Sequence, residues 1–296
     1  MRLSWLQAVI GLFLTAILSA PAWGATPPLP GTLNYLEGQA RVGTEALNSK
    51  SIGSVQLQAG ESLSTDANGR AEILLTPGVF LRLGENSSVK MISPSLTNTE
   101  VVLSQGEAMV EVDQIHKANN IRIAEGNTTA QLLKTGLYDF DSQQNQIRIF
   151  DGQALVRSGD QEVKVKGGHE VSLSMGEKLK AKKFDKKAEE GDLYRFSSLR
   201  SSYLAEANAQ ASRAYVTYGW WPGAGWWWNP WFGGYTFIPA GGVFYSPFGW
   251  GFYPTYVVAV APVHYYRPPV PARPVAPGWA YRGDAEFHGG FGFHGR

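Results

Sequence analysis

Between Gly31 and Leu179 the chain consists of short runs in which apolar and polar residues alternate, and this alternation limits the possible fold more than any other feature. Side chains two positions apart lie on the same face of a β-strand, so each run buries one face and leaves the other polar. The clearest runs are Ala71–Leu75, Ala108–Val112, Ile121–Ile123, Ile147–Ile149, Val163–Val165 and Val171–Leu173.

Turn-forming residues separate these runs, for example Asp66–Gly69, Pro77-Gly78 and Asp151-Gly152. Short strands with a turn about every 8 to 12 residues are typical of all-β folds. No helical crossover interrupts the runs, which argues against an α/β fold. We therefore predict an all-β domain over residues 31–180, built as an irregular β-solenoid or as a two-sheet β-sandwich of short strands.

A five-residue element recurs in this region. Its copies are Gly38–Val42, Gly106–Val110 and Gly152–Val156, and in each a glycine leaves a turn before a strand that places Ala and Val on one face. The intervals between the copies are unequal, so the chain is not an array with a fixed period.

Four phrases in the first half of this region carry a family resemblance. Gly38–Val42 is a strand that follows a glycine, Leu57–Thr65 contains G-x-x-L-x-T, Gly69–Gly78 is a strand between glycine turns, and Leu81–Ser88 has L-x-x-x-S spacing. In this order, over about residues 33 to 130, they resemble the FecR domain.

In its best-known setting, the resemblance implies the extracytoplasmic part of an inner-membrane regulator that relays an outer-membrane signal to a sigma factor. Such proteins carry a cytoplasmic anti-sigma segment ahead of a membrane helix. Only Met1 to Ser4 precede the apolar run here. We therefore expect an exported FecR-like protein without the anti-sigma segment, which keeps the β-domain and its protein-binding role.

The first 24 residues predict export. Arg2 is followed by the apolar run Trp5–Leu18 and then by the small-residue cleavage pattern Ala22-Trp23-Gly24, the order found in secretory signal peptides. A transmembrane helix needs roughly 20 apolar residues, so a cleaved signal at 1–24 is favoured over a retained anchor. The chain has no cysteine, which excludes a lipid-anchored cysteine and disulfides. The predicted location is the periplasm or the outer cell surface.

Residues 181–214 are predicted to form a charged hinge and an amphipathic helix. Lys178–Glu190 is rich in lysine, and from Asp192 to Ala214 apolar residues recur at helical spacing. The apolar positions are Leu193, Phe196, Leu199, Tyr203 and Leu204. We expect this stripe to pack on the β-domain, with binding to a partner as the alternative.

Residues 215–266 form an aromatic segment rich in glycine and proline. Prolines recur every seven to nine residues from Pro222 to Pro262 and forbid a continuous helix, so this segment does not cross a membrane as a helix. Tyr235–Pro239 and Val243–Pro247, joined by three small residues, predict a hairpin. Residues 267–296 read as a flexible Pro, Gly and His tail.

Tryptophans in the aromatic segment are the candidate interaction surface, because large exposed aromatic patches mark contact sites. These aromatic side chains have three possible places of burial. The first is the chain's own β-domain, the second is the envelope, a membrane surface or another copy of the chain, and the third is a glycan on which the rings stack. The candidate residues are Trp220, Trp221, Trp226, Trp227, Trp228, Trp231 and Trp250.

No catalytic constellation is evident in the sequence. His116 and His169 lack a G-x-S-x-G elbow or another nucleophile motif, and we expect Asp139 and Asp141 to lie on the solvent side of a strand. His288 and His294 alone make a poor metal site. We predict no enzyme, no cofactor and no metal.

The balance of charges narrows the partner classes. With 26 Lys+Arg against 25 Asp+Glu, nothing in the overall charge attracts nucleic acid. The predicted function is a non-catalytic binding or scaffolding protein of the bacterial cell envelope, FecR-like and sensory, whose partner is an envelope protein or another copy. The alternative is a carbohydrate-binding or carbohydrate-active β-solenoid protein.

Overall fold

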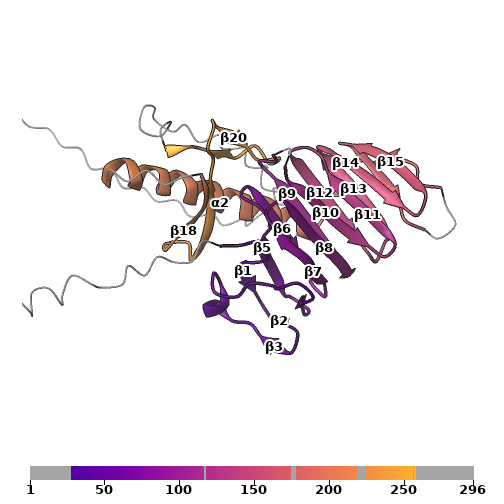
Figure 1. Cartoon of the computed structure of the whole chain (residues 1–296), viewed down its shortest axis with the longest axis horizontal. Helices are drawn as coiled ribbons and strands as arrows, with labels where there is room; N and C mark the ends of the chain where they lie inside the picture. The colour runs from indigo at the N-terminus through magenta and orange to yellow at the C-terminus, as the bar shows by residue number, and fades with distance from the viewer. Residues whose placement is uncertain (1–27, 117, 175–177, 219–223, 256, 258–296) are drawn as a thin grey trace, which may run out of the picture. The chain divides into compact units, whose positions relative to one another are not determined.

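The computed structural model describes residues 28–116, 118–174, 178–218, 224–255 and 257 (Figure 1). The predicted signal peptide and the predicted tail lie outside the described residues, as do Trp220 and Trp221. The described strands and the helix belong to one compact unit.

Two large sheets account for most of the described chain. The eight-stranded sheet has the strand order β1 (Leu33–Glu37), β5 (Arg70–Leu74), β6 (Val79–Leu83), β9 (Glu107–Val112), β12 (Gly136–Asp141), β13 (Gln146–Asp151), β16 (His169–Ser172) and β17 (Lys182–Lys183). The nine-stranded sheet has the order β15 (Gln161–Lys166), β14 (Gln153–Ser158), β11 (Thr128–Leu132), β10 (Asn120–Glu125), β8 (Asn98–Gln105), β7 (Ser88–Ser95), β4 (Ser62–Thr65), β2 (Ala40–Val42) and β3 (Glu45–Ala46). One 3-10 turn, Ser49–Ser51, follows β3.

The inner faces of the two sheets enclose one apolar core. Ile73 and Val110 of the eight-stranded sheet belong to the same buried cluster as Val101, Ile123 and Val156 of the nine-stranded sheet. The alternating runs in the sequence supply these side chains, as predicted. The all-β prediction is confirmed, and of the two architectures expected, the described residues form the two-sheet sandwich.

Strands β8 and β10 are the one parallel neighbouring pair among the described strands. Between them the chain runs through β9 in the opposite sheet, which carries it from one end of the sandwich to the other. The change of sheet from β9 to β10 therefore lies at the opposite end of the sandwich from the change from β8 to β9. As a consequence, the turns of the β10–β11, β12–β13 and β14–β15 hairpins gather at one end of the sandwich.

The recurring glycine element marks corners where the chain passes from one sheet to the other. Gly38, Gly106 and Gly152 have φ angles of 66°, 79° and 97°, and each precedes a strand of the other sheet. An added Cβ would lie 2.2 Å from Ser87 Oγ at Gly106 and 2.3 Å from Tyr138 Oη at Gly152. Glycine is required because both the left-handed backbone and the close approach exclude a side chain.

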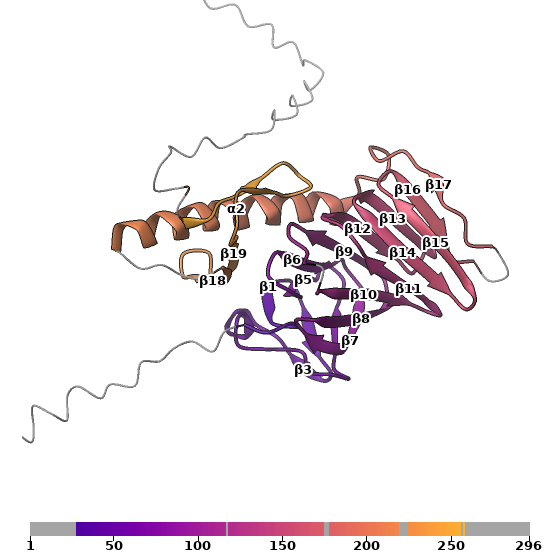
Figure 2. The same ribbon diagram turned by 45° about the horizontal axis from the view of Figure 1, so that its top comes forward.

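Helix α2 (Asp192–Tyr218) covers part of the outer face of the eight-stranded sheet, where it contacts β6 and β9 (Figure 2). It begins where the sequence predicts. Leu193, Phe196 and Leu204 are buried in clusters with apolar residues of the eight-stranded sheet, which confirms that the helix packs on the β-domain. The prediction is wrong for Leu199 and Tyr203, which are 51% and 46% exposed.

Two short hairpins of the aromatic segment follow the helix: β18 (Gly225–Asn229) with β19 (Gly234–Ile238), and β20 (Phe244–Tyr245) with β21 (Gly251–Phe252). The predicted hairpin, which would pair β19 with β20, is wrong. The Asn229 side-chain oxygen accepts hydrogen bonds from the backbone N–H groups of Trp231 and Phe232, and this closes a turn before β19.

The corner glycines allow a matched test of steric closeness. We expect Gly60→Ala to lower the free energy of unfolding by about 1–2 kcal/mol, because Gly60 has a φ of 91° with open space around it. Gly106→Ala should cost about 1–3 kcal/mol more, since its Cβ would meet Ser87. Urea unfolding measures both, and equal losses would contradict the corner assignment.

Candidate protein-binding groove

The outer face of the eight-stranded sheet carries charged side chains among apolar ones, and most of it is buried. Glu72 of β5 stands opposite Arg82 of β6, and Asp139 of β12 stands opposite Arg148 of β13. Glu72 and Arg82 are fully buried, and Asp139 and Arg148 are 2% and 5% exposed. These residues alternate with the apolar residues of the inner face, so the strand pattern itself places charges in rows across the sheet.

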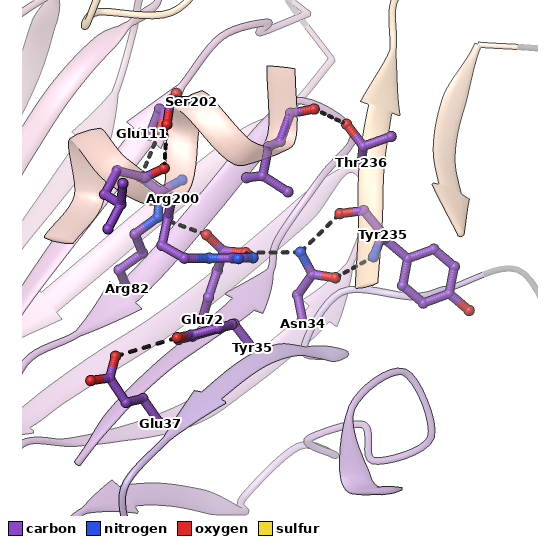
Figure 3. Close-up of polar contacts among 12 residues, drawn as sticks. Asn34, Tyr35, Glu37, Glu72, Arg82, Glu111, Arg200, Ser202, Tyr235 and Thr236 are labelled. Atoms are coloured by element: carbon purple, nitrogen blue, oxygen red, sulfur yellow. Dashed lines mark hydrogen bonds and ion pairs between the residues drawn. The ribbon is translucent and has the colours of Figure 1, made fainter. Parts of the chain in front are cut away.

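Helix α2 binds this face through a buried ion network, which we define as Glu72, Arg82, Glu111 and Arg200, labelled in Figure 3, together with Ser201. Arg82 donates from Nε to Glu72 at 2.7 Å and from Nη1 to Glu111. From the helix, Arg200 donates to Glu72 at 2.9 Å, and Ser201 donates to Glu111 at 2.6 Å. Both carboxylates thus bind Arg82 on the sheet and one residue of the helix.

The same network reaches the aromatic hairpin through a buried asparagine. Asn34 of β1 donates to Glu72 at 2.8 Å and to the carbonyl of Tyr235 at 2.9 Å, and its oxygen accepts from the Tyr235 N–H at 2.6 Å (Figure 3). On the helix, Asn208 binds the carbonyl of Phe237 and both backbone groups of Tyr253. Two buried amides therefore attach the C-terminal hairpins to the sandwich and the helix.

Charges within the network determine the ionisation of its acids. Burial alone would raise the pKa of Glu72, but the charges and hydrogen bonds of Arg200 and Arg82 outweigh it and lower the pKa to about 2. Burial raises the pKa of Asp113, which lies directly after β9, well above its ordinary value, and the Glu111 charge raises it further. The network therefore holds two arginines and two carboxylates, and burial and the Glu111 charge disfavour the ionised form of Asp113 beside it.

A groove of about 310 Å³ lies beside this network, between the edge strand β1, β5 and the first turns of α2. Its apolar wall includes Tyr35 and Phe196, whose ring centroids are 5.7 Å apart. The Arg200 guanidinium lies 4.1 Å from the centre of the Tyr35 ring, so the residue that pairs with Glu72 also supports the groove wall. The groove is thereby built on the buried ion network.

Charged side chains of both signs surround the groove. Glu37 and Arg70 line it from the sheet, and Asp192 and Arg195 line it from the helix. Arg70 lies 3.8 Å from Glu37, and Arg195 pairs with Asp192. An apolar wall with a rim of mixed charge is the usual anatomy of a protein-binding surface.

Exposed apolar side chains extend the groove along the helix. Leu199 and Tyr203 both line it, and the ring of Tyr203 lies 6.3 Å from that of Phe232, which is 38% exposed. Trp231, in the same turn as Phe232, is 89% exposed. The turn between β18 and β19 thus adds aromatic surface next to the helix.

The described tryptophans of the predicted interaction surface do not form one surface. Trp226, Trp228 and Trp250 are half-buried against the cluster that contains Leu74, Phe80 and Phe237. Trp227 packs on Ala211 and Ile238. Trp231 alone among the described candidates is highly exposed.

Sequence reasoning missed Leu199 and Tyr203 as surface residues because it assigned every apolar position of the helix to the buried face. The sheet-facing positions include Ser197, Arg200 and Ser201, which are polar and buried. Small residues at a spacing of four, from Ser197 to Ser201 and Ala205, were the available signal, since they allow a helix to approach a neighbouring element closely.

The histidines and aspartates considered for catalysis in the sequence, His116, His169, Asp139 and Asp141, do not come together in one site. His116 is exposed and lies next to Gln114, and His169 is half-buried and contacts the carbonyl of Gly167. Asp139 and Asp141, expected on the solvent side, are 2% and 6% exposed, which corrects that expectation.

Asp139 and Asp141 are buried because they share a cationic partner, Arg148. Arg148 lies 3.1 Å from Asp139 and 3.7 Å from Asp141, and Glu189 covers Arg148 from the segment before α2 at 3.3 Å. Polar residues on a strand thus become buried when a later segment closes over them.

The fold and groove define an all-β sandwich whose outer face, with its buried charges, is partly covered by the helix that follows it. The family described as FecR protein matches residues 61–155, so the predicted resemblance is confirmed, and the chain contains a FecR region. The match includes Glu72, Arg82 and Glu111 and ends before α2.

Two solved structures resemble the chain, both of a proposed anti-sigma factor from Parabacteroides distasonis ATCC 8503. They are 13% and 12% identical, with TM-scores of 0.37 and 0.38, and cover 46% and 47% of this chain. The chain spans 62% and 64% of theirs, just under two thirds. No curated protein matches the chain. Among the described helical residues, none forms a helix long and apolar enough to span a membrane.

Removal of one network carboxylate tests the network energetically. Glu72→Gln should lower the free energy of unfolding by about 3–5 kcal/mol at pH 7, because Arg82 and Arg200 lose a buried partner. The control Glu85→Gln, whose side chain is 43% exposed and lies 3.5 Å from Arg70, should cost at most about 1 kcal/mol.

The pH dependence of this effect has a definite sign. Since the folded chain lowers the pKa of Glu72 from 4.5 to about 2, its stabilisation is complete above pH 4.5 and is lost as the pH falls through 2. Glu72→Gln should lack this part of the acid titration of stability. Equal stability profiles for Glu72→Gln and Glu85→Gln would contradict the assignment.

Proposed function

We propose that the protein is a non-catalytic, FecR-like binding module of the bacterial cell envelope, exported to the periplasm or outer surface, with a sensory or scaffolding role. The observation that carries this proposal is the groove beside α2 with its exposed side chains Leu199 and Tyr203. The FecR region and the apolar run at the N-terminus support the envelope setting.

The chemistry of the groove indicates the kind of partner. Its apolar wall suits an aliphatic or aromatic side chain of another protein, and its paired charges suit polar groups of either sign around that anchor. The partner is thus a folded or extended protein segment with one apolar anchor, and no strongly charged polymer is required.

The groove wall is already fixed by contacts within the protein, so a partner can bind without first ordering it. Arg200 is fixed by Glu72 below the groove, and Phe196 is 6% exposed and packed against the sheet. Binding therefore requires little rearrangement of the wall, and Leu199 and Tyr203 supply apolar area that a partner removes from water.

Site-directed photo-crosslinking from full-length protein in intact cells tests this proposal. A crosslinker at Leu199 should trap a defined envelope protein, and a crosslinker at Leu96, which is 44% exposed in the β7–β8 turn, should not. Leu199→Asp should weaken binding of the purified partner about tenfold or more, whereas Leu96→Asp should leave it unchanged.

The rival function is glycan binding, for which the 89% exposed Trp231 is the favouring observation. A glycan array with the full chain separates the two. Glycan binding that depends on Trp231, together with equal crosslinking from positions 199 and 96, would overturn the protein-binding proposal.

A further inference from the structure

Lysine is concentrated in one stretch of the chain, between Gln161 and Lys187. Eight of the twelve lysines of the sequence lie there, together with four acidic residues and no arginine. The structure describes all eight, and every one of them is exposed. We call this set the lysine cluster, and its members are Lys164, Lys166, Lys178, Lys180, Lys182, Lys183, Lys186 and Lys187.

The fold brings these lysines to one edge of the sandwich. β15 and β17 are the edge strands of the two large sheets, and β15 contacts β16, the neighbour of β17 (Figure 2). The chain just before β17 bridges the two sheets, because Leu179 and Ala181 pack against the apolar core and the Leu179 N–H donates to the Gln161 side chain at 2.8 Å. Side chains alternate along an extended chain, so Lys178 and Lys180 point away from the core.

Acidic residues of this edge are bound elsewhere and do not neutralise the lysine cluster. Glu162 lies 2.7 Å from Arg157, and Glu170 lies 3.6 Å from Arg148. Asp185 accepts hydrogen bonds from two backbone N–H groups of the turn that follows it. The fourth acid lies outside the described residues. No carboxylate of the described chain forms an ion pair with a lysine of the cluster, so the edge carries an uncompensated positive charge.

Protection of the sheet edges does not account for the whole cluster. Lysines on an edge strand hinder its pairing with another sheet, and four of the eight lie on β15 or β17. The other four lie outside the strands, where no ladder of backbone groups needs protection: Lys178, Lys180, Lys186 and Lys187.

The spread of these charges indicates an extended anionic partner. None of the lysines lines the groove or the cavity of about 550 Å³ beside Gln161 and Leu179, so they do not converge on one small anion. Lysine is a compact charge without the planar fork with which arginine binds one phosphate at two points. Many phosphate groups spread over a surface suit such a set of point charges.

A nucleic acid fits this edge less well than a lipid surface does. Phe184 is the only Phe, Tyr or Trp between Gln161 and Lys187, and its ring packs on Phe150 with the centroids 5.2 Å apart. The lysine stretch therefore offers no free Phe, Tyr or Trp ring on which a base could stack.

We propose that the lysine cluster binds the surface of an anionic phospholipid bilayer, with its ammonium groups at the level of the lipid phosphates. The affinity then depends on how many lysines lie near the surface rather than on one contact. The sheet residues of the groove lie on β1 and β5, at the other end of the strand order, so the groove stays open while the cluster lies on the bilayer. This site is independent of the protein partner proposed for the groove.

Co-sedimentation of the full-length protein with lipid vesicles tests the site. Vesicles of phosphatidylcholine with about one third anionic phosphatidylglycerol should bind the protein at least about tenfold more tightly than vesicles of phosphatidylcholine alone. The neutral vesicles measure any binding through apolar parts of the chain, so the difference reports the charge. A rise in salt from about 0.05 M to about 0.5 M should remove this difference.

Two matched double variants locate the binding surface. Lys164→Gln with Lys180→Gln removes two lysines of the cluster and should weaken binding to the anionic vesicles about tenfold or more. Lys50→Gln with Lys90→Gln changes the net charge equally, at exposed positions in the 3-10 turn and in β7, and should weaken binding less than about threefold. All four side chains are exposed, so both variants should melt at the temperature of the wild type.

Three results would overturn the proposal. The first is equal binding to neutral and anionic vesicles, and the second is an equal loss of binding in the two double variants. The third is binding of double-stranded DNA at the same salt as tightly as the anionic vesicles, which would assign the cluster to polyanions in general. Crosslinking from Leu199 reports only the groove, so failure of either proposal is recognised separately.

Discussion

A buried arginine sets the main constraint on this structure. Arg82 is fully buried on the outer face of a sheet, and removal of a guanidinium from water is tolerated only when it is paired and hydrogen-bonded. Glu72 and Glu111 pair with it, but the two acids then need further donors, and α2 supplies them as Arg200 and Ser201. Arg200 lies 128 residues after Glu72, so the FecR region is closed by a segment outside it.

The positions of the other features follow from this closure. The helix brings Leu199 and Tyr203 to the surface because its opposite face carries the polar residues that bind the sheet. Asn34 extends the same contacts to the β18–β19 hairpin. Four of the seven tryptophans identified in the sequence are thereby half-buried, and the groove becomes the leading candidate for a partner.

Local pattern predicted much of the fold and less of the site. Alternation identified the strands, and the glycine elements located three corners, because both depend on neighbours in sequence. Pairing of β19 with β18 depended on the Asn229 turn, and burial of Asp139 depended on Arg148 and Glu189. Helical spacing showed that Leu193 and Leu199 recur as apolar positions, but it could not show which of them faces the sheet. The face of the helix that packs on the sheet is determined by Glu72, Arg82 and Glu111 on β5, β6 and β9, which are distant from the helix in sequence.

Amide hydrogen exchange in Arg200→Met tests most directly whether the buried ion network holds the helix on the sandwich. Glu72 keeps Arg82 and Asn34 in this variant, so the sandwich retains its own contacts while α2 loses its ion pair. The account predicts exchange at least about tenfold faster in α2, with protection in β10 and β12 preserved. Unchanged exchange in α2, or equal acceleration in α2 and the sandwich strands, would contradict it.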